Sequence, residues 1–158
     1  MGYQNRKAAN SCNSLFLANN RWQMQTCSLP ILGAHHDLYE IEIVFKELCD
    51  LLKQAEIQTE GLFLNADAGF DSHSFRSLCV EIKIKANIAL NPRNGQTPDA
   101  YIYFDKELFK HKNVIERVNA WMGSFKTLRI WFETKTLHWL TLLLIAFSVL
   151  FIRKITCK

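Results

Sequence analysis

Residues 61–72 read GLFLNADAGFDS, and the change of character within this stretch decides the fold. A short apolar run is followed by two acids, Asp67 and Asp71, on either side of a glycine. An acid at the end of a buried strand is costly unless it is paired, solvated or bound to a cation. The stretch therefore predicts a strand over residues 61–67 that is buried on both faces. Each acid beyond it is either part of a helix cap or part of a metal site.

Strands and helices are predicted to alternate on both sides of this stretch. Apolar residues recur at helical spacing between Leu38 and Ala55, and Asp37 with Glu40 resembles a capping box at the start of that helix. Pro92 closes the strand that follows the acids, and Ser72 is placed to cap a short helix between the two strands. Strands are expected over 13–20, 24–31, 61–67 and 85–92, and helices over 37–57, 72–82, 111–126 and 136–154. This order is typical of an α/β fold.

Size and charge indicate one globular domain with an uneven surface. The chain has 158 residues, of which 49% are hydrophobic and 22% charged. Residues 1–36 contain no acid, whereas residues 76–135 carry eleven Lys and Arg against six acids. A basic surface of this kind suits a polyanion, although a run of charge is also found on any solvated face.

The cysteines and the termini bear on the compartment. The five cysteines form no C-x-x-C pair, which favours free thiols in a reducing cytosol over a zinc ribbon or a disulfide framework. Residues 1–12 lack the apolar region of a signal peptide, so we expect a cytoplasmic protein. Residues 137–152 form an apolar run of 16 residues, whereas a membrane-spanning helix needs about 20. A core helix is therefore favoured, and a membrane anchor is the alternative.

Three acids are candidates for a metal site: Asp67, Asp71 and Glu116. Carboxylates that converge can hold two Mg²⁺ ions about 3.5–4 Å apart for in-line phosphoryl transfer. Nearby Lys and Arg side chains would then contact DNA phosphates. The alternative is structural: Asp71 or Ser72 caps a helix, and Glu116 pairs with Lys112 or Arg117.

Several segments of the chain together resemble one protein family. They are ADAGFDSHSFRSLC (66–79), NIALNPRNG (87–95), YFDKELFKHKNVIERVNAWMGSFKTLRIWFETK (103–135) and WLTLLLIAFSVLFIRK (139–154), with MGYQNRKAANSCNSLFLANN (1–20) and LGAHHDLYEIE (32–42) upstream. These segments are similar to the C-terminal part of bacterial insertion-sequence transposases of the DDE class. The resemblance covers nearly the whole chain. It implies a partial DDE catalytic domain over residues 1–158, built on a truncated RNase H-like fold with a mixed sheet flanked by helices.

The resemblance implies roles for particular residues. The family's second catalytic aspartate falls on Asp67 and its glutamate on Glu116, and these two would be the metal ligands as well. Phe109 and Lys112 stand where related sequences have tyrosine and arginine, and lysine lacks the planar fork of arginine. DNA is the implied partner, and the DNA-contacting residues would be Arg93, Lys112, Arg117 and Lys126. A full-length transposase is a second candidate partner.

The resemblance also implies that something is missing. The family's first catalytic aspartate lies upstream of the segment related to residues 1–20, and the first acid of this chain is Asp37. The sequence is therefore interpreted as a truncated, decaying transposase copy that lacks the central first strand of its sheet. A metal pair held by Asp67 and Glu116 alone would lose the ligand that bridges both ions. We expect weak Mg²⁺ affinity and no strand transfer. The alternative is a small non-catalytic interaction or membrane protein that uses residues 137–152.

Overall fold

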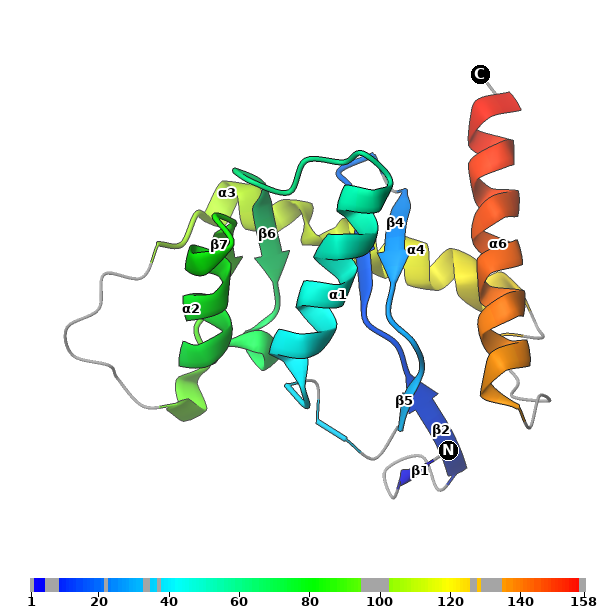
Figure 1. Ribbon diagram of the computed structural model, residues 1–158, viewed down its shortest axis with the longest axis horizontal. Coiled ribbons are helices and arrows are strands. Elements are labelled where there is room, and N and C mark those ends of the chain that lie inside the picture. The colour runs from blue at the N-terminus through cyan, green and yellow to red at the C-terminus, as the bar shows by residue number, and fades with distance from the viewer. Residues whose placement is uncertain are drawn as a thin grey trace. The chain divides into compact units, whose positions relative to one another are not determined.

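A computed structural model describes residues 2–4, 9–21, 23–32, 35–36, 38–94, 103–125, 128 and 135–156 (Figure 1). Its strands are β1 (Gly2–Gln4), β2 (Ala9–Asn13), β3 (Phe16–Ala18), β4 (Met24–Cys27), β5 (Ile31–Leu32), β6 (Phe63–Ala66) and β7 (Lys85–Ile88). Its helices are α1 (Ile41–Gln54), α2 (His73–Glu81), α3 (Lys106–Phe109), α4 (Asn113–Ser124) and α6 (Thr136–Thr156), with short 3₁₀ turns η2 (Ala68–Phe70), η3 (Pro92–Asn94) and η4 (Lys110–Lys112). The fold class is α/β, as predicted.

The strands pair in three small sheets. The order β1-β2-β5 is antiparallel throughout, and β3 pairs with β4 in an antiparallel hairpin. Among the strands that the structure describes, only β6 and β7 pair in parallel, with Asn65 opposite Asn87 and Ala66 opposite Ile88. The chain divides into two compact units, residues 36–113 and residues 1–35 with 114–158. Each unit is considered by itself, and the single domain expected from the length stays a prediction.

The unit of residues 36–113 is built on β6, α2 and β7, with α1 packed against α2 (Figure 1). Its core is formed where the apolar stripes of the two helices meet. The rings of Phe45 and Phe75 are both buried and meet edge to face, with centroids 5.1 Å apart. Burying each ring contributes about 2–3 kcal/mol. Cys49 and Cys79 are buried in the same helices as free thiols, and burial raises the pKa of Cys79 to about 11.

The helix α1 begins later than the sequence pattern predicts. Residues 38–40 form a turn, and Glu40 at the N-cap has a left-handed backbone with φ of 49°. A left-handed residue cannot continue a right-handed helix, so the first helical residue is Ile41. Glu40 makes no side-chain cap, so the expected capping-box role of Glu40 is wrong. Asp37, its expected partner, lies outside the described residues.

The strand β6 is less buried than its apolar sequence predicts. The expected strand over 61–67 shortens to Phe63–Ala66, and Leu62 and Phe63 are 43% and 46% exposed. The Phe63 ring lies near the exposed ring of Tyr103, and the Lys85 ammonium lies 5.1 Å from the centroid of the Phe63 ring. The prediction of burial on both faces is therefore wrong, because this face of the pair is covered only in part by described residues.

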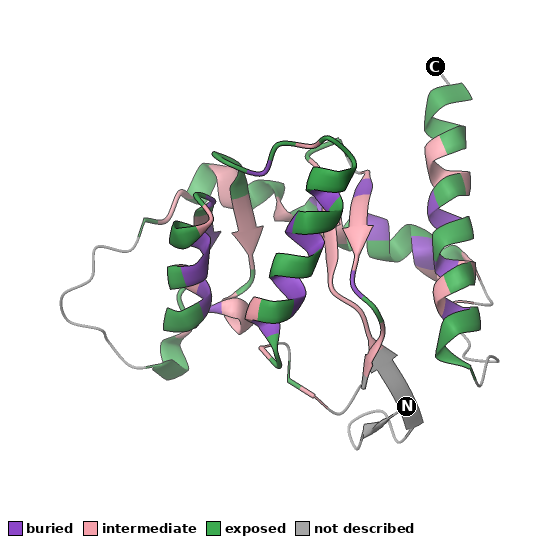
Figure 2. Cartoon of the chain, in the orientation of Figure 1, coloured by how far each residue is buried: buried purple, intermediate pink, exposed green. Residues whose placement is uncertain are grey.

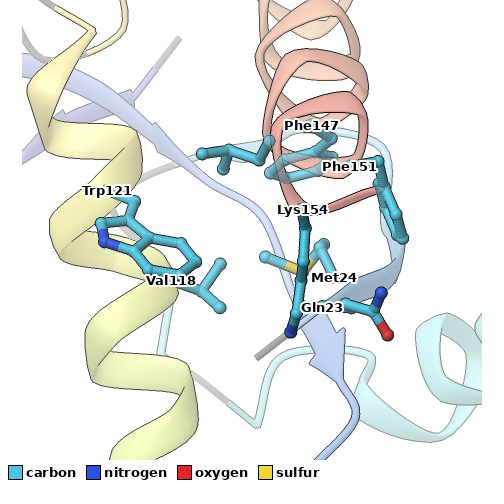
Figure 3. Close-up of a pocket in the computed structure, with 8 residues that line it drawn as sticks. Gln23, Met24, Val118, Trp121, Phe147, Phe151 and Lys154 are labelled. Atoms are coloured by element: carbon cyan, nitrogen blue, oxygen red, sulfur yellow. The ribbon is translucent and has the colours of Figure 1, made fainter. Parts of the chain in front are cut away.

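The other unit packs α4 and α6 against the β3–β4 hairpin. Asn19 closes the hairpin turn, where its side-chain oxygen accepts hydrogen bonds from the backbone of Arg21 (2.9 Å) and Gln23 (3.1 Å), which confirms the predicted turn. The core of this unit consists of Met24, Val118, Met122, Trp139, Leu143 and Phe147. A shallow hollow beside it, lined by Gln23, Trp121 and Lys154 among others, has a volume of about 20 Å³ (Figure 3). That volume holds a water molecule and excludes a nucleotide.

The helix α6 is apolar on more sides than the core can cover. An 18-residue stretch of this 21-residue helix has a mean hydropathy of 1.8, and 22% of that stretch is buried. Trp139, Leu143, Ala146 and Phe147 face the core, while Leu137 and Ile155 are 69% and 71% exposed. Figure 2 shows the buried residues along one stripe of the helix. The helix α6 therefore packs into a core, as predicted, but through one face only. By length and composition it is also a candidate membrane span.

Candidate functional site

Asp67 lies at the surface, directly after the end of a strand. It directly follows β6 and precedes η2, with extended backbone angles. Its side chain makes no capping hydrogen bond to η2 and is 59% exposed. The carboxyl end of a parallel strand is where open α/β sheets place their ligands. The structural alternative of a helix cap therefore does not apply to Asp67.

Lys112 contacts Asp67 from a segment that is distant along the chain. The Lys112 ammonium donates to Oδ1 of Asp67 at 2.8 Å, and it also lies 5.2 Å from the centroid of the Phe109 ring. A half-exposed ion pair of this kind contributes at most about 1 kcal/mol to stability. The pair therefore adds little to stability, but it shows that a positive charge lies next to the Asp67 carboxylate.

Two asparagines, of which Asn87 is buried and Asn65 partly buried, hold the segment that carries Lys112. Asn87 is fully buried and donates to Oδ1 of Asn65 (2.8 Å) and to the carbonyl of Asp105 (2.9 Å), while its own oxygen accepts from the Asp105 amide (2.7 Å). Asn65 in turn donates to the carbonyl of Leu108 at 3.0 Å. Paired asparagines on β6 and β7 thus fix both ends of α3 to the sheet, and Lys112 follows within one turn.

Asp71, the second acid of the stretch, has a structural role. It is buried, and its Oδ1 accepts from Nε of Arg76 at 2.8 Å. Its Oδ2 accepts from the backbone amide of Asn91 at 2.7 Å. Arg76 also donates to the carbonyl of Ile88 at 2.8 Å. Asp71 therefore ties the loop after β6 to the loop after β7. Ser72 caps α2, as predicted, by accepting from the amide of Phe75.

The remaining candidate residues lie on elements other than the one that carries Asp67. Glu116 and Arg117 are exposed in the first turns of α4, whose buried face is formed by Val114, Val118 and Met122. Arg93 is exposed in η3, where its backbone amide donates to the side chain of Asn91. Lys126 lies outside the described residues. Asp67 belongs to one compact unit and Glu116 to the other, so the convergence of their carboxylates stays a prediction.

The described residues do not form a ready divalent-metal site. No group of three or more His, Cys, Asp or Glu side chains close enough to hold an ion occurs among them. Within its own unit Asp67 meets an ammonium, whereas a Mg²⁺ ion requires oxygen ligands arranged octahedrally at about 2.0–2.1 Å. The donors that this unit brings together therefore do not fit a two-ion site.

Sequence reasoning missed the residues that position the site. Asn65, Asn87 and Arg76 were assigned no role, yet they hold the loops at the carboxyl ends of β6 and β7. The signal was present, because Asn87 lies between Ala86 and Ile88 in a strand, and a polar residue has to satisfy its hydrogen bonds when it is buried there. Their partners, which are backbone groups of segments 12 to 43 residues away, leave no mark in the sequence.

Comparison with known proteins gives one match. The family model described as DDE superfamily endonuclease matches residues 1–151 of the 158. No curated protein and no solved structure gives a significant match.

Proposed function

Because the chain belongs to the DDE superfamily endonuclease family, we propose that it derives from the transposase of a bacterial insertion sequence and is directed at DNA. The family generally acts on DNA with the help of a divalent metal. The observation that supports a functional site is the exposed carboxylate of Asp67 at the end of β6, contacted by Lys112. The other acid of the same stretch is buried in an ion pair and is unsuited to this role.

Asp67 and Glu116 are the two acidic residues that we assign to the catalytic site. The support for Glu116 is its place in the chain: it follows Lys112 by four residues, and Lys112 binds Asp67. Both carboxylates are accessible to solvent, as ligands for a hydrated ion have to be. Residues 1–36 contain no Asp or Glu that could act as the first acid of the family. With two acids, these 158 residues would bind Mg²⁺ weakly and would not carry out strand transfer.

Lys112, Arg117, Lys126 and Arg93 are the residues that we assign to the DNA backbone. Lysine and arginine bind phosphate through charge, independently of base sequence. A complete transposase of the same family is a second proposed partner, and the cytoplasm is the proposed compartment. The surface around Asp67 then serves DNA binding even without a complete metal site.

We expect the chain to bind duplex DNA with an affinity that falls steeply with salt. Each phosphate contact releases counterions when it forms. Replacing Lys112, Arg117 or Arg93 by alanine should therefore make the slope of log K against log salt less negative by about one in each case. Fluorescence anisotropy with a labelled duplex at several salt concentrations measures the slope. Lys53→Ala is the matched control, since Lys53 is exposed and pairs with Asp50 on the acidic helix α1. Equal slopes for Lys112→Ala and Lys53→Ala would contradict the assignment.

The same preparation tests the expected lack of cleavage. A supercoiled plasmid incubated with Mg²⁺ or Mn²⁺ should not be nicked above the rate of the Asp67→Ala variant. Nicking by the unaltered chain that Asp67→Ala abolishes would show that two acids suffice.

A membrane anchor is the second candidate function, and α6 favours it. The helix is 21 residues long, about the length that crosses a bilayer, and 22% of its most apolar 18-residue stretch is buried. Arg153 and Lys154 in its last turn would lie on the cytosolic side by the positive-inside rule. On this account α6 would leave the core of its unit for the lipid.

Fractionation separates the two candidates. If the chain is directed at DNA, we expect a carbonate wash of the membranes to release it, because carbonate strips proteins that do not span the bilayer. A chain that stays in the pellet and is extracted by detergent as a monodisperse species would favour the anchor.

A further inference from the structure

Lys112 differs from the other lysines that form ion pairs among the described residues. Its side chain is 32% exposed, whereas Lys46, Lys53, Lys83 and Lys110 are between 52% and 70% exposed. Its ammonium has a second favourable neighbour in the face of the Phe109 ring, 5.2 Å away. Lys112 is therefore held against Asp67 more firmly than a solvated surface lysine would be.

The placement of Lys112 is built into the fold. Asn87 binds both the amide and the carbonyl of Asp105, and Asn65 binds the carbonyl of Leu108. These bonds fix α3 to the strands, and Asp67 directly follows one of those strands. Because both partners are anchored to the same pair of strands, their charges are brought together at little further cost in entropy.

A divalent ion and the ammonium cannot share Asp67 without strong repulsion. The Lys112 nitrogen already lies 2.8 Å from Oδ1, and a Mg²⁺ or Mn²⁺ ion has to approach a carboxylate oxygen to about 2.1 Å. Two like charges within about 4 Å repel each other appreciably even in water, and the repulsion doubles when one of them is divalent. Either cation can therefore neutralise Asp67, and each weakens the binding of the other.

We infer that Lys112 acts as the resident cation of Asp67 and that a divalent ion has to displace it. The inference rests on the proposed function, in that it concerns the same carboxylate, and it adds a reason why metal binding is weak. Lys112 lowers metal affinity at Asp67 through direct competition. The released ammonium keeps the face of Phe109 as a second contact, so displacement leaves the fold unchanged.

Mn²⁺ titration of the ¹⁵N-labelled full chain tests this competition, since paramagnetic broadening detects weak binding at individual amides. The readout is the Mn²⁺ concentration that halves the amide signals of residues 66–70. In Lys112→Ala this concentration should fall on the order of tenfold, because a positive charge within about 4 Å of the ion is removed. Lys112→Gln should give the same gain, which guards against a folding defect peculiar to alanine.

Two further variants assign the effect to the pair. Lys110→Ala removes the same charge two residues away, from a lysine that pairs with Glu107, and should leave the concentration within about twofold, as expected for a solvated charge. Adding Asp67→Asn to Lys112→Ala should abolish the gain. The inference is overturned if Lys112→Ala binds no better, if Lys110→Ala gains as much, if the gain survives loss of Asp67, or if no variant binds Mn²⁺. If Lys112→Ala shows the expected gain in Mn²⁺ affinity but the unaltered chain does not bind DNA, the proposed function is contradicted and the inference about Lys112 is not.

Discussion

Replacing Asp71 by alanine is expected to lower the free energy of unfolding by about 3–5 kcal/mol, as for other buried ion pairs that lose one partner. The change would leave the guanidinium of Arg76, 17% exposed, without its carboxylate, and the amide of Asn91 without its acceptor. Urea denaturation followed by circular dichroism measures the loss.

Asp67→Ala is the matched control, because it removes the same group four residues earlier in the same stretch. Asp67 is 59% exposed and pairs with Lys112, so the change should cost at most about 1 kcal/mol. Similar losses for the two variants would contradict the division into one structural and one functional acid.

Replacing Asn87 by alanine is expected to cost about 2–4 kcal/mol, because buried partners are left unsatisfied. Asn87 is fully buried and makes three hydrogen bonds, two of them to the backbone of Asp105. The amide of Asp105 should also exchange its hydrogen much faster in the variant, since its acceptor is gone. Denaturation and hydrogen exchange measure the two effects.

Asn119→Ala is the control for this prediction, since Asn119 is exposed on α4. It should change stability by no more than about 0.5 kcal/mol. An unchanged exchange rate at Asp105 in Asn87→Ala would show that another group holds this segment, and Asn87 would lose its positioning role.

The sequence predicted elements well where periodicity and end signals agree. The helix α2 begins after Ser72 as expected, and β6, α4 and α6 lie within about two residues of their predicted bounds, while β7 ends four residues early. The predicted start of α1 was wrong because Glu40 takes a left-handed conformation that its side chain does not announce. The strands β1 (GYQ) and β2 (ANSCN) were missed because they contain no apolar run or alternation, and β5 because it has only two residues.

The candidate site was predictable in its acids and not in their surroundings. A strand that ends in an acid indicated Asp67, but the same pattern treated Asp71 as an equal alternative. Burial distinguishes the two, and burial depends on Arg76 and on the loop that contains Asn91. The pairing of Lys112 with Asp67 spans 45 residues and follows from tertiary contacts of Asn65 and Asn87, which a linear pattern cannot reveal.

The central claim is that Asp67 and Glu116 belong to one site, and their separation tests it most directly. A crystal structure of the chain grown with Mn²⁺ would give the distance between the two carboxylates and the position of any ion. The account predicts that their oxygens lie within about 10 Å of each other, close enough to be joined by one or two ions and their waters. Carboxylates held further apart, on surfaces that face different directions, would contradict it.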